Sequence, residues 1–298
     1  MSGQPETVSK KVRPFYWSVR RELWENKSLY LAPLIVAGVI VIGFMFSAVG
    51  LAERRQAVLL LNDPVKARTA IEMPYSMAAM MIMFTAFIVA VFYCLDALHG
   101  ERRERSILFW KSLPVSDFTT VMSKAVVAFV VIPIITFAVV IATDLIIFLI
   151  SSVVLAVHGV SPATTLVQTH YFLNVVLFLY GIVVLTLWHI PTYSWMLLVS
   201  GWARRAAFLW AILPWIAIVF FERITFGTYY FSSFIKNRFS SPAATAFNFP
   251  DPKHPCLDSL SQLTFGRYLT TPGVWIGLAV GVAFLAVAIR MRRYRGPM

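Results

Sequence analysis

The residues best suited to chemistry form a charged run that leads into an apolar and aromatic run, within residues 99–124. The charged part reads Gly100-Glu101-Arg102-Arg103-Glu104-Arg105, and Ile107-Leu108-Phe109-Trp110 follows after Ser106. A segment that is charged at one end and aromatic at the other suits a short helix that inserts into a soluble partner protein. A charge cluster that sets membrane orientation, followed by a helix at the membrane interface, explains the same pattern. Both interpretations stay open.

The chain lacks the motifs that would let it catalyse a reaction by itself. None of its 14 glycines is followed by Lys, so the phosphate-binding GxxxxGK[ST] loop of ATPases is absent. The HExxH and GxSxG patterns are also absent. The histidines are scattered, at positions 99, 158, 170, 189 and 254. We therefore expect no enzyme activity, no catalytic residues, no metal site and no cofactor bound by this chain.

The composition shows what must position these residues. Of the 298 residues, 59% are hydrophobic and 13% are charged, whereas about a quarter are charged in soluble domains. The mean hydropathy is +0.74. The apolar residues fall in blocks long enough to cross the hydrocarbon core of a bilayer. The sequence predicts a single all-α integral membrane domain, residues 1–298, with six transmembrane helices at about Leu29–Leu51, Met77–Leu98, Ala125–Val157, Tyr171–Ser200, Ala206–Phe221 and Thr271–Ala288.

The Lys and Arg residues predict how these helices are oriented. If both chain ends are cytoplasmic, 17 of the 26 Lys and Arg residues lie on that side and nine lie outside. Because cytoplasmic loops carry an excess of positive charge, this orientation is favoured. The net charge of +12 is spread over the edges of the apolar blocks. We therefore expect the lipid bilayer, and no nucleic acid, to face these charges.

Two segments outside the spans have patterns of their own. Within residues 1–28, Phe15, Val19 and Leu23 recur every four residues, which predicts a cytoplasmic interfacial helix with its apolar side in lipid. A plain charged leader is the alternative. Residues 222–270 form a long external loop rich in aromatic residues, and we expect short helices there at the outer membrane surface.

Single residues inside the spans suggest further roles. Asp144 lies within the third span, where an ionisable side chain is costly and needs a partner, such as Thr143, Thr186 or His189. It either lines a translocation path or only joins two helices. Gly273, Gly277 and Gly281 share one face of the sixth span and allow close packing. That face packs either on a helix of the same chain or on a second subunit.

The order of the short motifs resembles the transmembrane permease subunits of type-2 ABC exporters. The matching positions in the loop and at the start of the third span are Glu101, Arg102, Ser106, Leu108, Ser112, Leu113, Pro114, Val115, Ser116 and Lys124. Arg21-Glu22-Leu23-Trp24-Glu25-Asn26 is similar to that family's N-terminal interfacial helix. Pro191-x-Tyr193 and Ser200-x-x-Ala203-Arg204-Arg205 resemble the end of its fourth span. The resemblance covers nearly the whole chain.

The resemblance implies a function and partners. Residues 101–117 would be the cytoplasmic coupling helix between spans two and three, which docks on a separate ATPase (nucleotide-binding) subunit. The docking residues would be Glu101, Arg102, Arg105, Ser106, Leu108, Phe109, Trp110, Leu113 and Pro114. ATP and Mg would bind to that partner, and a second permease subunit would complete a dimer, most naturally in a bacterial inner membrane. An ion-gradient-driven secondary transporter and a non-transporting membrane scaffold are the alternatives, and the transported substrate stays open.

Overall fold

A computed structural model of the chain describes residues 14–59, 64–104, 115–159, 171–248 and 260–294. Over these ranges the chain is helical, and the only β pairing is an isolated bridge between Phe247 and Leu263. The predicted all-α fold class is confirmed. The elements are α1 (Pro14–Glu25), α2 (Ser28–Ser47), η1 (Ala48–Gly50), α3 (Leu51–Leu59), α4 (Pro64–Asp96), α5 (His99–Arg103), α7 (Asp117–Val126), the π-helical turn η2 (Val127–Val131), α8 (Ile132–Val157), α10 (Tyr171–Trp202), α11 (Ala207–Phe226), α12 (Tyr230–Ala246), η3 (Leu260–Gln262), α13 (Phe265–Thr270) and α14 (Pro272–Tyr294).

Six helical segments in the described part of the chain are long and apolar enough to cross a membrane. Their bounds are Ser28–Val58, Lys66–Arg103, Asp117–Val157, Tyr171–Trp202, Ala207–Phe226 and Pro272–Tyr294. Each coincides with a predicted span, so the number and approximate position of the spans are confirmed. The chain has the helices of a multi-pass membrane protein.

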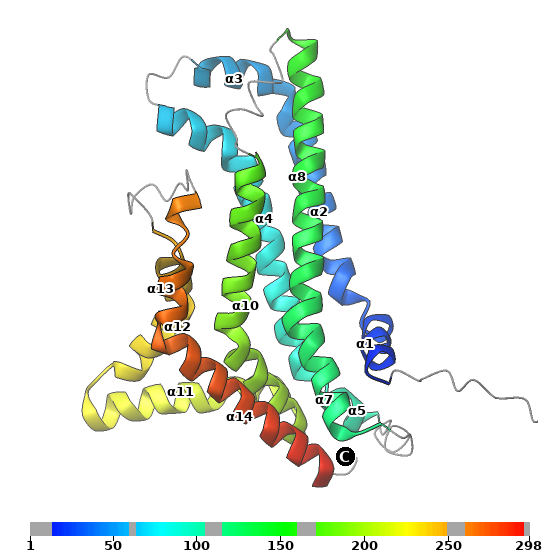
Figure 1. Cartoon of the computed structure of the whole chain (residues 1–298), viewed down its shortest axis with the longest axis vertical. Helices are drawn as coiled ribbons and strands as arrows, with labels where there is room; N and C mark the ends of the chain where they lie inside the picture. Colours follow the sequence, from blue (N-terminus) through cyan, green and yellow to red (C-terminus); the bar gives the residue numbers. More distant parts are fainter. Residues whose placement is uncertain (1–13, 60–63, 105–114, 160–170, 249–259, 295–298) are drawn as a thin grey trace, which may run out of the picture.

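The long helices lie side by side along the long axis of the molecule (Figure 1). α2, α4 and α8 pack on one another, α10 packs on α4, and α14 packs along α10. The largest buried apolar cluster joins α2, α4, α7 and α10 and includes small residues such as Ala90 and Ala125. α1 and the C-terminal end of α14 lie at the same end of the molecule. We call this the α1 end.

The third apolar segment is much longer than a bilayer requires. It runs through α7, η2 and α8 over 41 residues, which is about 60 Å of helix. The hydrocarbon core is about 30 Å thick. Pro133 does not break this helix because it stands at the second position of α8, after the π-helical turn, where a missing N–H group is tolerated. The segment therefore extends well beyond the hydrocarbon.

The fifth apolar segment, α11, runs across the long axis instead of along it (Figure 1). The corner before it contains Ala206, which has a positive φ of 50° and is the sole non-glycine residue of this kind among the described residues. Only 11% of the most apolar window of α11 is buried. Its far end is closed by Gly227, also at positive φ, and by the Glu222 carboxylate, which accepts hydrogen bonds from the backbone N–H groups of Tyr230 and Phe231.

The long loop predicted at 222–270 contains helices α12 and α13, which pack back onto the bundle. The Trp188 indole of α10 donates a hydrogen bond to the Arg238 carbonyl oxygen at 2.6 Å. The Arg238 guanidinium donates to the carbonyl oxygens of Trp188 and Gly273. Trp188, Ala246 and Tyr268 belong to one buried apolar cluster. The described part of this loop is therefore held between α10 and α14.

Candidate functional site

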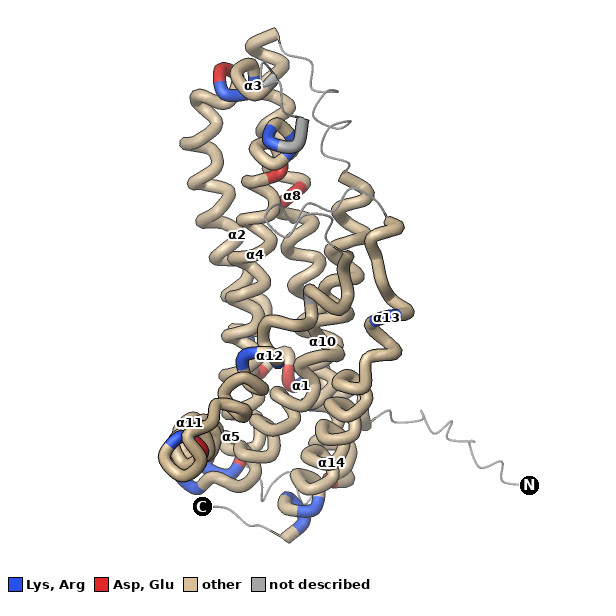
Figure 2. The backbone as a smooth tube through the Cα atoms, turned by 90° about the vertical axis from the view of Figure 1, so that its left-hand side faces the viewer, with Lys and Arg blue, Asp and Glu red and all other residues tan. Residues whose placement is uncertain are grey.

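Six charged side chains meet at the α1 end of the molecule, and we call them the charged cluster. They are contributed by α1, α5, α7 and α14, and are Arg21, Glu22, Glu101, Asp117, Lys124 and Arg292. Glu22 is 1% exposed, Lys124 2%, Arg292 6% and Glu101 9%. By contrast, α2 carries no charged residue, and α4 carries none between Glu72 and Asp96 (Figure 2). At the α1 end, four charged side chains of the cluster are thus buried inside the protein.

Local helix geometry explains why these charged residues are buried. Glu22 lies on the same face of α1 as Val19 and Leu23, both of which pack against the core. Lys124 follows buried Val121 by three residues on α7. Residues three and four apart share a helix face, so a charge at this spacing enters the core with its apolar neighbours. Arg292 follows buried Leu285 and Ala288 on α14 in the same way.

Glu22 is held by two other helices. The Lys124 ammonium donates to Glu22 Oε1 at 2.7 Å, and the Tyr93 hydroxyl of α4 donates to Glu22 Oε2 at 3.0 Å. The Arg21 guanidinium also donates to Oε1, at 2.9 Å. Both oxygens of this buried carboxylate are therefore hydrogen-bonded, which a buried charge requires.

Glu101 is the centre of the cluster. Its Oε1 lies 3.1 Å from the Lys124 ammonium and 3.2 Å from the Arg21 guanidinium. Its Oε2 accepts a hydrogen bond from Arg292 Nη1 at 2.6 Å. Arg292 Nε donates in turn to Asp117 Oδ1 at 3.0 Å. Glu101 thus joins α5 to α1, α7 and α14 at once.

The charges of the cluster are balanced, with three cations and three carboxylates. Burial acts to lower the pKa of Arg21, but Glu22, Glu25 and Glu101 outweigh it and raise the pKa overall. Burial also raises the pKa of Glu25 at the rim of the cluster, although Arg21, 3.5 Å away, acts in the opposite direction. With three formal positive and three formal negative charges in contact, the cluster has no net formal charge.

A second set of contacts fixes the corner between α4 and α5 to the end of α10. The Ser200 hydroxyl oxygen accepts hydrogen bonds from the backbone N–H groups of Leu98 and His99, both at 2.8 Å. Arg102 Nη1 donates to the carbonyl oxygens of Gly201 and Ala203, at 2.9 and 3.2 Å. A cation is stabilised at a helix C-terminus, where carbonyl groups lack partners within the helix.

This arrangement fastens helices together and offers no catalytic group. Each carboxylate of the cluster is paired with a cation, so none is available as a general base. No group of three or more His, Cys, Asp or Glu side chains able to hold a metal occurs in the described ranges. Removing one member would leave an uncompensated buried charge, which is strongly destabilising.

Of the predicted docking residues, two are buried in the structure and the others lie outside the described residues. Glu101 and Arg102 lie inside the chain, in the contacts just described, and neither presents its charge to a partner. Arg105, Ser106, Leu108, Phe109, Trp110, Leu113 and Pro114 lie outside the described residues. The described flanks of this segment are α5 before it and α7 after it. α7 begins at a Ser116 cap whose hydroxyl oxygen accepts from the Thr119 N–H group.

The N-terminal helix differs from the prediction in the direction of its faces. α1 forms, but Val19 and Leu23 contact the protein core and not lipid. Burying Glu22 against Lys124 and Tyr93 turns this face inward. The exposed side of α1 instead carries Trp17 and Trp24, 52% and 61% exposed. The Arg20 guanidinium stacks over both rings.

Asp144 lies apart from the charged cluster, near the middle of α8. Its Oδ1 is buried and has no hydrogen-bond partner among the described residues. The predicted partners bond elsewhere, because Thr143 donates to the Val139 carbonyl and His189 contacts the Leu185 carbonyl. The side chains close enough to interact electrostatically around this point form what we call the distal polar group: Arg55, Tyr75, Asp144 and Tyr171.

The glycine face of α14 is covered by the same chain. A Cβ atom at Gly281 would lie 2.7 Å from Ile190 Cγ2 of α10, and one at Gly277 would lie 2.6 Å from the Arg238 guanidinium. At Gly273 the nearest atom belongs to Trp188, at 3.7 Å. The three glycines therefore let α14 approach α10 and accommodate Arg238, within one subunit.

Sequence reasoning did not single out Glu22, Tyr93, Lys124 or Arg292 as a group. The available signal was the position of each charge on an apolar helix face, as for Lys124 after Val121. Arg292 gave the weaker signal because Arg residues at a span end are also expected from membrane orientation alone. Searches of family models, curated proteins and solved structures found no match to the chain.

Proposed function

We propose that the chain is the membrane-spanning permease subunit of an ABC exporter, and that residues 105–114 couple it to a separate ATPase subunit. The observation that carries this proposal is the fixation of both flanks of that segment by buried ionic contacts. On the α5 side, Glu101 and Arg102 bind α14 and the end of α10. On the α7 side, Asp117 and Lys124 bind α14 and α1.

Such flanks suit the transmission of force. A push on residues 105–114 would reach three helices, α1, α10 and α14, through short charged contacts, and these contacts are costly to break. A loop that served only to connect two spans would not need its flanks joined to α1, α10 and α14. The energy would come from ATP and Mg on the partner, because the sequence of this chain lacks a phosphate-binding loop.

The proposal also includes an orientation in the membrane and a second permease subunit. Both chain ends would be cytoplasmic, with the α1 end facing the ATPase, in a bacterial inner membrane. A second permease subunit would pair with this one. α11 favours such a pairing, because large apolar side chains such as Leu213 and Phe220 are exposed along it.

The test is a pull-down in mild detergent of the tagged chain, expressed with its genomic neighbours, followed by an ATPase assay. One variant replaces residues 105–114 with a Gly/Ser sequence of equal length. A matched control replaces residues 160–169, between α8 and α10, in the same way. We expect a P-loop protein to co-purify with the wild type and the control and to be lost from the first variant. A chain that purifies alone, without ATPase activity, would overturn the proposal.

One observation favours a second candidate, an ion-gradient-driven transporter. Asp144 has a buried oxygen with no partner among the described residues, and such a carboxylate suits a proton or cation relay. For this candidate, uptake into vesicles would follow an imposed pH gradient without ATP. Asp144→Asn would abolish that uptake while leaving the amount of folded protein unchanged.

A further inference from the structure

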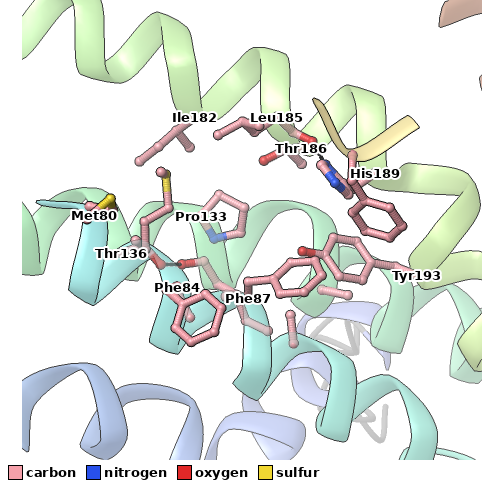
Figure 3. A pocket seen from close by; sticks show the side chains of 16 residues that line it. Met80, Phe84, Phe87, Pro133, Thr136, Ile182, Leu185, Thr186, His189 and Tyr193 are labelled. Carbon is pink, nitrogen blue, oxygen red and sulfur yellow. Dashed lines mark hydrogen bonds between the residues drawn. The ribbon is translucent and has the colours of Figure 1, made fainter. Parts of the chain in front are cut away.

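A cavity of about 330 Å³ lies between α4, α8 and α10 (Figure 3), and Phe239 of α12 is also among its lining residues. It is distinct from the charged cluster and from the distal polar group, and lies between them along α4 and α8. Two local irregularities border it. The π-helical turn η2 supplies Ala128 and leads into Pro133, and Pro191 lies inside α10 two residues after His189. Turns of this kind are frequent at functional sites.

The cavity has one polar end. Thr186, His189 and Tyr193 gather there, whereas Met80 lies at the opposite end (Figure 3). His189 and Tyr193 are 7% and 8% exposed. The hydroxyl groups of Thr186 and Tyr193 have no hydrogen-bond partner within the described ranges. Both hydroxyl groups and the His189 ring belong to residues that line the cavity, so this end is suited to a ligand with a polar group of its own.

The hydrogen bonding of His189 fixes what that polar group must be. His189 Nδ1 lies 2.8 Å from the Leu185 carbonyl oxygen. A carbonyl oxygen only accepts, so Nδ1 carries the proton and Nε2 of the neutral ring is an acceptor. The ligand group that pairs with Nε2 must therefore be a donor, a hydroxyl or an N–H group.

The walls define the rest of the ligand. Among the described residues that line the cavity there is no Lys, Arg, Asp or Glu. The rings of Phe87, Tyr193 and Phe239 surround the His189 ring with centroids 5.7 to 6.3 Å away, and aromatic ligands pack well against such rings. At the other end, Met80 and Phe84 are 58% and 63% exposed, so a ligand can enter from the lipid side.

We propose that this cavity is a binding site for a small, uncharged aromatic molecule that carries one hydroxyl or N–H group. The group donates to His189 Nε2, and the aromatic body lies against Phe84 and Phe87. A lipid acyl chain fits the apolar part but leaves Thr186, His189 and Tyr193 unpaired. The inference goes beyond the proposed function, since it concerns this chain alone and holds with or without an ATPase partner.

The experiment uses photolabelling of the full chain in lipid nanodiscs by a matched pair of probes, 4-hydroxybenzophenone and benzophenone. Adducts are mapped by mass spectrometry. We expect 4-hydroxybenzophenone to label Met80 or Met83 at the cavity about three to ten times more than benzophenone does, the ratio that one net hydrogen bond provides. Met45 of α2, which is 57% exposed, reports labelling from bulk lipid and should not distinguish the two probes.

Two variants separate binding from partitioning into lipid. His189→Leu should abolish the preference for the hydroxylated probe and leave benzophenone labelling in place. Ala128→Trp should fill the cavity and remove cavity labelling by both probes. Unchanged Met45 labelling shows that each variant is folded in the bilayer, and Tyr193→Phe provides a milder substitution should His189→Leu fail to fold. Equal cavity labelling by both probes in the wild type would mean that lipid fills the cavity, and would overturn the proposal.

Discussion

The charged cluster and the distal polar group are about one hydrocarbon thickness apart, measured along α4 and along the continuous segment of α7, η2 and α8. Tyr93 and Tyr75 of α4 are 18 residues apart, which is about 27 Å of helix. Lys124 of α7 and Asp144 of α8 are 20 residues apart in one continuous helical segment, about 30 Å. If the charged cluster marks one boundary of the hydrocarbon, Asp144 lies at the other boundary.

The charged cluster and the distal polar group differ in how their buried polar side chains are paired. In the charged cluster, every carboxylate has a cation within 3.2 Å. In the distal polar group, Asp144 Oδ1 and the hydroxyl groups of Tyr75 and Tyr171 are buried without hydrogen bonds among the described residues. A closed set of ion pairs resists rearrangement, whereas unpaired groups can take up a proton, an ion or water. The charged cluster therefore holds its helices together. The distal polar group can instead change its protonation or bind an ion or water.

The largest effect should come from Glu101→Ala. This change removes the carboxylate that contacts Arg21, Lys124 and Arg292, and leaves three buried cations with two carboxylates. We expect the free energy of unfolding to fall by about 3–5 kcal/mol. SDS titration of the purified protein in mixed micelles measures it.

Glu104→Ala is the matched control for this prediction. Glu104 is only three residues away but is 67% exposed, and its ion pair with Arg103 spans 3.6 Å. Surface pairs of this kind contribute about 0–1 kcal/mol. If Glu101→Ala and Glu104→Ala were equally stable, the charged cluster would not hold the helices together as its geometry indicates.

The next effect tests whether the pairs inside the cluster depend on one another. Lys124→Met should cost about 1.5–3 kcal/mol, because Glu22 keeps its contacts with Arg21 and Tyr93. Glu22→Gln combined with Lys124→Met removes both charges, and should cost less than the sum of the two single changes. Additive losses in this double-mutant cycle would show that Glu22 and Lys124 act separately.

Arg292→Lys should have a smaller effect, since it keeps the charge and changes only the geometry. Arg292 contacts Glu101 through Nη1 and Asp117 through Nε. A lysine ammonium is a single point charge and cannot reproduce this planar two-sided contact. We expect a loss of about 1–1.5 kcal/mol, the value of one hydrogen bond. Wild-type stability of the variant, measured by the same titration, would argue that the charge alone matters.

Some of these features could be predicted from the sequence, and the reasons are physical. The six apolar helices follow from hydropathy, because a run such as that of α2 has no other stable place than lipid or a core. The direction of α11 could not be predicted, since an apolar helix of 20 residues has the same composition whether it crosses the bundle axis or follows it. Its direction depends on the corner at Ala206, a residue type that does not signal positive φ.

The charged cluster and its neighbouring contacts were also predicted only in part from the sequence. Glu101 and Arg102 were expected to dock on a partner because the resemblance to the permease family implies it. Their burial depends on partners far away in the sequence, Arg292 for Glu101 and the end of α10 for Arg102. Charge pairing over such separations leaves no local pattern beyond the apolar neighbours of each residue.

The smallest effect on stability should come from Asp144→Asn. This variant tests most directly whether the distal polar group differs from the charged cluster. The substitution keeps the shape of the side chain and removes a carboxylate whose Oδ1 is buried without a hydrogen-bond partner among the described residues. We expect the free energy of unfolding to change by less than about 0.5 kcal/mol. A loss comparable to that of Glu101→Ala would show that Asp144 is also part of a fastening. A neutral result for stability, combined with altered transport, would instead assign the fixed and the changeable parts of the molecule to opposite boundaries of the membrane.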